Sequence, residues 1–316
     1  MPSPSPTTRV LVVGDANPDL VLRGDVVPRF GQAEQLLDDA SLVIGGSAAI
    51  TAHGFARLGR PVGLVAAVGK DVFGAQLTAD LETAGVDVST LLQRADVSTG
   101  LTVVLSRGDD RAILTRPGAI PTLTAAEVEA AADSVTGLGH VHVSSFFLQP
   151  DLAADLSGLL GSLRARGVTT SLDTNADPAG TWAGVDAVLP QLDVLLPNRA
   201  EVLALGRDTD AVAAARRLAA AGPLVVVKDG ADGAFAVDAR GAVTTVPGEA
   251  AVPLDSTGAG DTFAAAFLDG WLAGRPLEEN LRRAVRAGAL SVAALGGTAG
   301  QPTPTDLTTA GRNDDH

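Results

Sequence analysis

The sequence predicts an α/β protein with a mostly parallel sheet and helices on both faces of that sheet. Two observations lead to this fold class. Short apolar runs without polar–apolar alternation recur along the chain, as in strands that are buried on both faces. Longer helical patterns lie between these runs, and strand followed by helix, repeated, indicates βαβ units.

The elements follow one another in a regular order. The expected strands are Arg9–Val13, Val62–Val68, Val141–Ser144, Val168–Leu172, Val194–Leu196 and Leu224–Val227. The expected helices between them are Ser47–Leu58, Val72–Ala84, Ala125–Ala132, Leu152–Arg166 and Ala211–Ala220. The late elements are a hairpin of Ala234–Val237 with Ala242–Val246, the helices Asp261–Ala273 and Leu277–Leu295, and an expected frayed tail, Asn313–His316.

Two segments interrupt this alternation. Leu101–Ser106 and Ala112–Thr115 are short runs joined by Arg107–Arg111, which predicts a hairpin. Leu20–Asp38 is irregular and lies between the first strand and the first helix. These insertions form either a small sheet that projects from the main one or ordinary surface loops. With no repeat and no low-complexity linker, we expect one domain over residues 1–316.

The composition excludes several classes of protein. The net charge of −14 disfavours nucleic acid and anionic membranes as partners, and the absence of Tyr disfavours base-stacking platforms. Without Cys, the chain has no disulfides, thiol nucleophiles or cysteine-ligated metals. No run is long enough to span a membrane, and Met1–Thr8 lacks the pattern of a signal peptide. We therefore expect a soluble cytoplasmic protein.

A glycine loop directly before a helix carries the strongest local signal. The loop runs from Asp255 through Gly258, Ala259 and Gly260 to Asp261. A glycine loop that ends at a helix N-terminus binds anions through free amides and the helix dipole. Asp261 either caps the helix or acts as a general base, kept ionised by the local positive potential that also stabilises a transferring phosphoryl group.

Other phosphate-binding motifs do not match. Gly69-Lys70 is followed by Asp71 rather than Ser or Thr, and Leu64 stands where a P-loop needs its first glycine. Phe263 replaces the third glycine of a dinucleotide fingerprint. These differences disfavour a P-loop NTPase and a nucleotide-dependent dehydrogenase.

Three further groups of residues are candidates for binding. Asn198 and Glu201 share one face of a first helical turn, where they either hold the water shell of Mg²⁺ or form a capping box. Asn17 and Asp19 follow the first strand, at the sheet edge where α/β proteins bind ligands, and are candidates for hydroxyl recognition; a turn fixed by Asn-Pro is the alternative. His140 and His142 share a strand face without a third ligand, so we interpret them as structural.

Together these motifs resemble the ribokinase-like, or PfkB, family of carbohydrate kinases, from about Arg9 to Pro304. The family's C-terminal signature stands here as Asp255–Asp261, with Ser256 in place of the usual Thr. The matching N-terminal and central blocks are Gly45-Gly46 followed by Ala56–Gly59, Gly69-x-Asp71-x-x-Gly74, Asn198-x-x-Glu201 and Val226–Ala234.

The resemblance implies a three-layer α/β/α fold with a small β-sheet lid, formed by about residues 18–40 and 99–117. It implies ATP-dependent phosphorylation of an alcohol, with Asp261 as base and Gly258, Ala259 and Gly260 as the anion hole. Asn198 and Glu201 would act on Mg²⁺ through water, and Asp255 and Thr257 match positions that hold a monovalent cation such as K⁺ in many members. The resemblance assigns the nucleotide to Asn198, Lys228, Gly230, Gly233, Thr257, Gly258 and Gly260, and the acceptor to Asn17, Asp19, Gly45, Gly46, Ser47, Ile50 and Phe147.

The chain departs from the family at the acceptor side. Ile50 stands where a sugar-binding Asn is usual, which disfavours a ribose-like polyol. Ser47 replaces the lysine of ribokinases, which weakens the case for an acceptor that already bears phosphate, although Arg107, Arg111 and Arg116 lie near the expected lid. Val285 occupies a place near the adenine that is often Asn or His.

These features predict a PfkB-type kinase for an unphosphorylated sugar, sugar acid or polyol. A nucleoside kinase of the same fold is the alternative enzyme, suggested by Ile50 and the pair Phe146-Phe147, which otherwise belongs to the core. A nucleotide-binding regulator without catalysis is the alternative from another class. The resemblance also implies a homodimer that forms through the lid.

Overall fold

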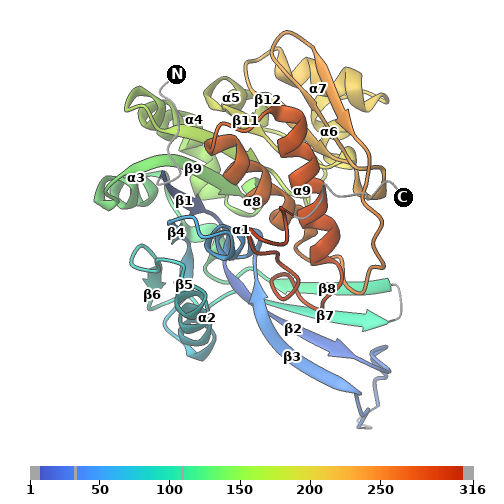
Figure 1. Cartoon of the computed structure of the whole chain (residues 1–316). Helices are drawn as coiled ribbons and strands as arrows, with labels where there is room; N and C mark the ends of the chain where they lie inside the picture. Colours follow the sequence, from blue (N-terminus) through green and yellow to red (C-terminus); the bar gives the residue numbers. More distant parts are fainter. Residues whose placement is uncertain (1–7, 32–33, 108–109, 309–316) are drawn as a thin grey trace.

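The computed structural model describes residues 8–31, 34–107 and 110–308. Within them, an eight-stranded central sheet has the order β14-β13-β12-β11-β10-β9-β1-β4 (Figure 1). In this sheet β4, β1, β9, β10, β11 and β12 are parallel to one another. Strands β13 and β14 run antiparallel to their neighbours. The bounds are β1 (Arg9–Val13), β4 (Val62–Val65), β9 (Leu138–Ser144), β10 (Thr169–Asp173), β11 (Val194–Leu195), β12 (Leu224–Lys228), β13 (Ala234–Val237) and β14 (Val243–Val246).

Helices cover both faces of this sheet, which confirms the three-layer α/β/α fold. Strand β1 needs cover on both faces, because its side chains from Val10 to Val13 alternate between the faces and are all apolar. Leu11 and Val13 pack with one set of helices, and Val10 and Val12 pack with the other. The first set is α3 (Ala125–Ser134), α4 (Pro150–Ala165), α5 (Val185–Val188), α6 (Arg199–Gly206) and α7 (Ala211–Ala219). The second set is α1 (Ser47–Arg57), α2 (Val72–Thr83), α8 (Ala259–Leu272) and α9 (Leu277–Ser291).

A second, four-stranded sheet projects from the main body at the lower edge of Figure 1, and we call it the lid sheet. Its order is β3-β2-β7-β8, in which β2 and β7 are parallel and the two outer pairs are antiparallel. The two interrupting segments of the sequence therefore contribute to a small sheet rather than to loops alone. The bounds are β2 (Asn17–Arg23), β3 (Asp39–Gly45), β7 (Leu101–Arg107) and β8 (Asp110–Arg116).

Four sequence expectations need correction or completion. The apolar run 62–68 is two strands, because the chain leaves the central sheet after Val65 and β5 (Ala67–Gly69) pairs with β6 (Leu92–Arg94) in a separate sheet. The segment 20–38 begins inside β2 rather than being irregular throughout. Helix α6 is an additional element, and α9 ends at Ser291, four residues before the expected end. The tail Asn313–His316 lies outside the described residues.

The two candidate histidines on β9 are structural, as expected. His140 and His142 are fully buried, and their ring nitrogens pair with the hydroxyl groups of Thr169, Ser171 and Ser144. Burial lowers the pKa of His140 to about 3, so its imidazole is neutral at physiological pH. These rings complete a hydrogen-bonded layer between β9 and β10.

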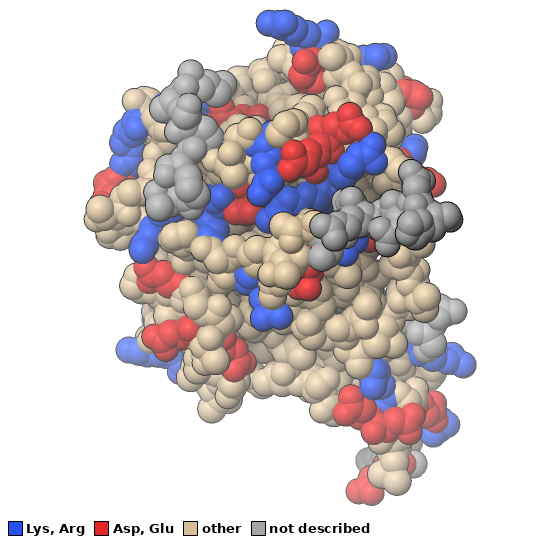
Figure 2. All heavy atoms as spheres, viewed as in Figure 1, with Lys and Arg blue, Asp and Glu red and all other residues tan. Residues whose placement is uncertain are grey.

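The surface carries charges of both signs. On the face shown in Figure 2, Asp and Glu side chains lie beside Lys and Arg side chains, and the middle of that face is mostly uncharged. No helix within the described ranges is both long enough and apolar enough to cross a membrane.

Candidate active site

The carboxyl ends of the parallel strands bring together the polar residues of the site. Asp15 follows β1, Asp173 ends β10, Asn198 follows β11 and Lys228 ends β12. These strand ends lie at one edge of the sheet, where open α/β folds bind ligands. Asp15 also joins this edge to the next element, because its carboxylate accepts hydrogen bonds from the Ser47 and Ala48 amides at 3.0 Å and so caps α1.

The glycine loop turns into α8 at Gly258, which has a φ of 71°. A Cβ atom there would lie 2.6 Å from the carbonyl oxygen of Gly297, so the turn requires glycine. Asp255 fixes the approach to the turn, because one carboxylate oxygen accepts from the amide of Thr257 at 2.8 Å and from its hydroxyl at 2.7 Å. The first turn of α8 follows directly, and the free amides of a helix start are the groups that the predicted anion site would use.

Asp261 lies in that first turn and is 8% exposed. The hydroxyl of Ser47 donates a hydrogen bond to its Oδ1, and the Asn175 side chain donates to Ser47 Oγ at 3.1 Å. Burial and the nearby charge of Asp173 raise the pKa of Asp261 to about 7, against the opposing effects of Ser47 and Lys228. Burial therefore outweighs the positive potential that was expected to keep this carboxylate ionised.

A buried cation lies next to the glycine loop. The Lys228 amine forms an ion pair with Oδ2 of Asp173, and a Cβ atom at Gly260 would be 3.4 Å from the amine nitrogen. Burial lowers the pKa of Lys228, but the charges of Asp173 and Glu201 outweigh burial and raise it above the usual value. Lys228 therefore stays protonated beside the anion site.

Asn198 and Glu201 form a complete capping box at the start of α6. The Asn198 side-chain oxygen accepts from the Glu201 amide at 2.9 Å, and the Glu201 carboxylate accepts from the Asn198 amide at 2.8 Å and from its side chain at 2.7 Å. Burial, together with Asp173, raises the pKa of Glu201 against the influence of Lys228. The capping interpretation is confirmed, and it leaves the pair oriented beside Lys228.

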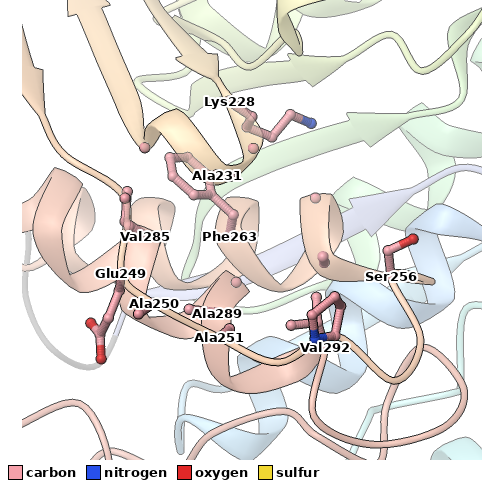
Figure 3. A pocket seen from close by; sticks show the side chains of 17 residues that line it. Lys228, Ala231, Glu249, Ala250, Ala251, Ser256, Phe263, Val285, Ala289 and Val292 are labelled. Carbon is pink, nitrogen blue, oxygen red and sulfur yellow. The ribbon is translucent and has the colours of Figure 1, made fainter. Parts of the chain in front are cut away.

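A cavity of about 650 Å³ opens beside the glycine loop (Figure 3). Lys228, Gly230 and Gly233 line it from β12 and the turn that follows, and Ser256, Ala259 and Gly260 line it from the glycine loop. Figure 3 shows the Lys228 amine pointing away from Glu249 and Val285. Most of the remaining wall is apolar; it includes Ala231, Ala250, Pro253, Phe263, Val285, Ala289 and Val292. The cavity thus contains a polar end at the loop and an apolar end at α9.

A second polar cluster lies at the junction with the lid sheet. The Asn17 side chain donates to Asp19 Oδ1 at 2.8 Å and to Thr102 Oγ1 at 3.1 Å. Burial raises the pKa of Asp19 to about 7, and the charge of Asp15 adds to this effect against the hydrogen bond from Asn17. Gly45 makes room for Asp19, because a Cβ atom there would overlap the carboxylate.

Two predicted acceptor residues pack mainly against protein. Ile50 is 3% exposed, and its side chain lies under the glycine loop, close to Gly258 and Gly297. Phe147 packs edge-to-face against Phe146 at 5.1 Å and against Trp182 at 5.4 Å between ring centroids. Both side chains belong to apolar clusters, so any contact with an acceptor is made by a limited part of each.

Sequence reasoning missed Asp173 and Asn175. Both residues follow the pattern that selected Asn17 and Asp19, because they end or follow a parallel strand, β10. The same reasoning therefore contained the signal that would have found them. Asp15 lies in the segment that follows the first strand, but its role in capping α1 depends on a partner 32 residues away.

Comparisons with known proteins identify the family of this chain. Residues 7–304 match the model of the pfkB family carbohydrate kinases. An ATP-dependent ribose-1-phosphate kinase from Halopiger xanaduensis is 31% identical over 90% of this chain and 91% of its own length. Two solved structures share the fold over 96% of this chain. One is an Escherichia coli protein in complex with ATP and Mg²⁺, which is 24% identical, is covered over 98% of its chain and has a TM-score of 0.84. The other is a Vibrio cholerae fructokinase with fructose, ADP and potassium ion bound, which is 23% identical, is covered over 97% of its chain and has a TM-score of 0.79. The chain belongs to the pfkB family of carbohydrate kinases.

Proposed function

We propose that the protein transfers a phosphoryl group from ATP to a hydroxyl group of an unphosphorylated sugar, sugar acid or polyol. The observation that carries this proposal is the position of Asp261. Its neighbour Gly260 lines the cavity, and the charge of Asp15 acts on the pKa of both Asp261 and Asp19. In this proposal Asp261 joins the donor and the acceptor halves of one site.

In the proposed reaction, Asp261 accepts the proton of the acceptor hydroxyl. The hydroxyl oxygen forms a bond to the γ-phosphorus, the bond to the bridging oxygen breaks, and ADP leaves with that electron pair. The loop residues Gly258, Ala259 and Gly260 would direct amide N–H groups at the charge that develops on the phosphoryl oxygens. A pKa near 7 suits a base that must be partly ionised at neutral pH.

The cavity beside the loop is the proposed ATP site. Its volume lies within the range of about 300–1,000 Å³ that is usual for ligand pockets, and its apolar end suits a purine. Gly230 and Gly233 let the chain turn closely around the cavity, with φ values of 59° and 101°. Lys228 and the side chain of Thr257 would lie at the phosphate end.

The residues present suit a magnesium ion that keeps its water. Asn198 and Glu201 offer an amide and a carboxylate that hold each other in place, which favours contact through water over direct coordination. When bound, Mg²⁺ would neutralise charge on the transferred phosphates. For the second cation that the family resemblance implies, Asp255 and Thr257 fit less well, because both side chains already have a cationic partner, Arg111.

Acceptor hydroxyl groups would bind to Asn17, Asp19 and Ser47, with Gly45 and Gly46 allowing close approach of the backbone. Ile50 and Phe147 would contribute apolar surface. The charge of Asp15 acts on both Asp19 and Asp261, so this end of the site is acidic, and a phosphate dianion on the acceptor would be repelled more strongly than a neutral sugar or the single charge of a sugar acid. This supports a neutral or hydroxyl-rich acceptor, and the lid sheet would close over it.

The decisive experiment measures ADP release with ATP and Mg²⁺ against a panel of sugars, sugar acids, polyols, sugar phosphates and nucleosides. The expected result is turnover on an unphosphorylated sugar, sugar acid or polyol. Turnover restricted to nucleosides would support the alternative enzyme and would give the aromatic pair Phe147–Trp182 a role in base binding. Nucleotide binding without turnover on any acceptor would support a regulator instead.

The oligomer is a separate proposal. The lid sheet exposes apolar side chains, and Leu42 on β3 and Leu114 on β8 lie on the same face of it. We propose that a second copy of the chain covers this surface in a homodimer. Light scattering after size-exclusion chromatography should give a dimer that Leu114→Asp shifts to monomer; a wild-type monomer at micromolar concentration would contradict the proposal.

A further inference from the structure

A side chain of the lid sheet reaches the start of the glycine loop. The Nη1 atom of Arg111, on β8, donates to Asp255 Oδ1 at 3.0 Å and to Thr257 Oγ1 at 2.6 Å. The Arg111 side chain is 35% exposed and that of Asp255 is 12% exposed, so the pair lies at the edge of the protein interior. The residues are 144 positions apart, and no local preference of the chain explains their contact.

Asp255 has little capacity left for another cation. Its Oδ1 accepts from Arg111 and from the amide and hydroxyl of Thr257, and its Oδ2 accepts from the Gly296 amide at 2.9 Å. Both carboxylate oxygens of Asp255 therefore already accept hydrogen bonds, and the Arg111 guanidinium supplies the positive charge beside them.

We propose that the Arg111 guanidinium takes the place of a monovalent cation at the glycine loop, so that catalysis by this chain does not depend on K⁺. The proposal rests on the proposed function, because it concerns the loop that would hold the transferred phosphoryl group. A guanidinium is charged at every physiological pH and presents its donors in a fixed plane. It therefore supplies a permanent positive charge where a free ion would have to bind.

Because Arg111 belongs to the lid sheet, its charge reaches the glycine loop only together with that sheet. A dissolved ion reaches the loop independently of the lid, whereas the guanidinium is attached to β8. Arg111 is thus a positioning residue, which orders Asp255 and Thr257 just before the anion hole when the lid sheet rests on the loop. Loss of its charge should lower kcat more than it raises KM for the acceptor.

The test compares wild type, Arg111→Gln, Arg111→Lys and the control Arg116→Gln. Arg116 ends the same strand, but its guanidinium contacts Ser98 instead of the glycine loop. Turnover is measured with Mg²⁺-ATP in KCl and in choline chloride at equal ionic strength. We expect wild type and Arg116→Gln to change less than about twofold between the salts, and Arg111→Gln to lose about tenfold of kcat in choline and recover at least about threefold in KCl. Arg111→Lys should restore most of the loss.

Thermal unfolding gives a readout that does not need an acceptor. A cation that binds only the folded chain raises its Tm, so K⁺ should stabilise Arg111→Gln more than choline does and should give wild type no such advantage. Wild-type activation by K⁺ above about fivefold, or an equal K⁺-specific Tm gain in wild type and Arg111→Gln, would overturn the proposal. Should no acceptor be phosphorylated in any salt, the proposed function fails, and the Tm comparison alone decides the role of Arg111.

Discussion

Replacing Ser47 by alanine removes the hydroxyl that donates to Asp261, and the effect is read in the pH dependence of kcat/KM. The hydrogen bond stabilises the ionised carboxylate, so its loss raises the pKa of Asp261 above the present value of about 7. A hydrogen bond to a charged group contributes about 1.5–3 kcal/mol, and about 1.4 kcal/mol corresponds to one pKa unit. Only part of that energy distinguishes the two protonation states of Asp261, so we expect its pKa to rise by about one unit.

The expected consequence depends on pH. With the pKa near 8, the ionised fraction of Asp261 at about pH 7 falls from about a half to about a tenth, so kcat/KM falls about fivefold. Near pH 9 the base is ionised in both proteins, so the part of the loss that depends on pH should disappear, and only the loss from the missing Ser47 contact with the acceptor, which does not depend on pH, should remain. The assay is a pH profile with saturating Mg²⁺-ATP, with Ser47→Thr as the hydroxyl-bearing control. An acidic limb that does not move, or an equal loss at every pH, would refute the reasoning.

Other substitutions test the same site. Asp261→Asn should lower kcat by about 10²–10⁴-fold. The raised pKa means that the folded state binds this proton more tightly than the unfolded state does, so wild-type stability falls as pH rises from about 4 to about 7; Asp261→Asn should therefore keep or raise the Tm at about pH 8. A kcat loss under about tenfold would show that Asp261 is not the general base. Ile50→Asn should improve turnover of ribose-like sugars if the amide reaches the acceptor, but it buries a polar group and should cost about 1–3 kcal/mol of stability, measured by urea unfolding. Unfolding of this variant would mean that Ile50 serves only the core. Gly258→Ala should reduce ATP turnover at least about tenfold, because the new methyl group would meet the Gly297 carbonyl; unchanged turnover would show that the turn can relax.

The central sheet could be predicted because its strands and helices alternate with strong apolar patterns. The break after Val65 could not, since every residue from Val62 to Val68 is apolar or glycine, and all are buried. Nothing local in that run marks where one sheet ends and another begins. Only the capping residues of helix α6 could be recognised in the sequence, because its eight residues are too few to show a clear helical period.

The residues of the candidate site also fall into two groups: those that local motifs predict and those that only the fold brings together. Asp261, Asn198 and Glu201 stand in short motifs whose spacing reports local structure, so the sequence identifies them. The partners that tune them are distant: Asp173 meets Lys228 across 55 positions, and Ser47 meets Asp261 across 214. The pKa of Asp261 depends on these pairings and on burial, and neither is encoded by neighbouring residues.

The topology of the lid sheet also bears on how the protein is made. All four of its strands lie within the first 116 residues, whereas Asp255 and Thr257 belong to the last quarter of the chain. Since segments fold as they emerge from the ribosome, the lid strands become available well before the loop that Arg111 contacts. During synthesis the Arg111 side chain therefore cannot contact Asp255 and Thr257 until the chain has been translated past residue 257. A nascent chain arrested at about residue 250 would contain all four lid strands without the contact that joins β8 to the glycine loop.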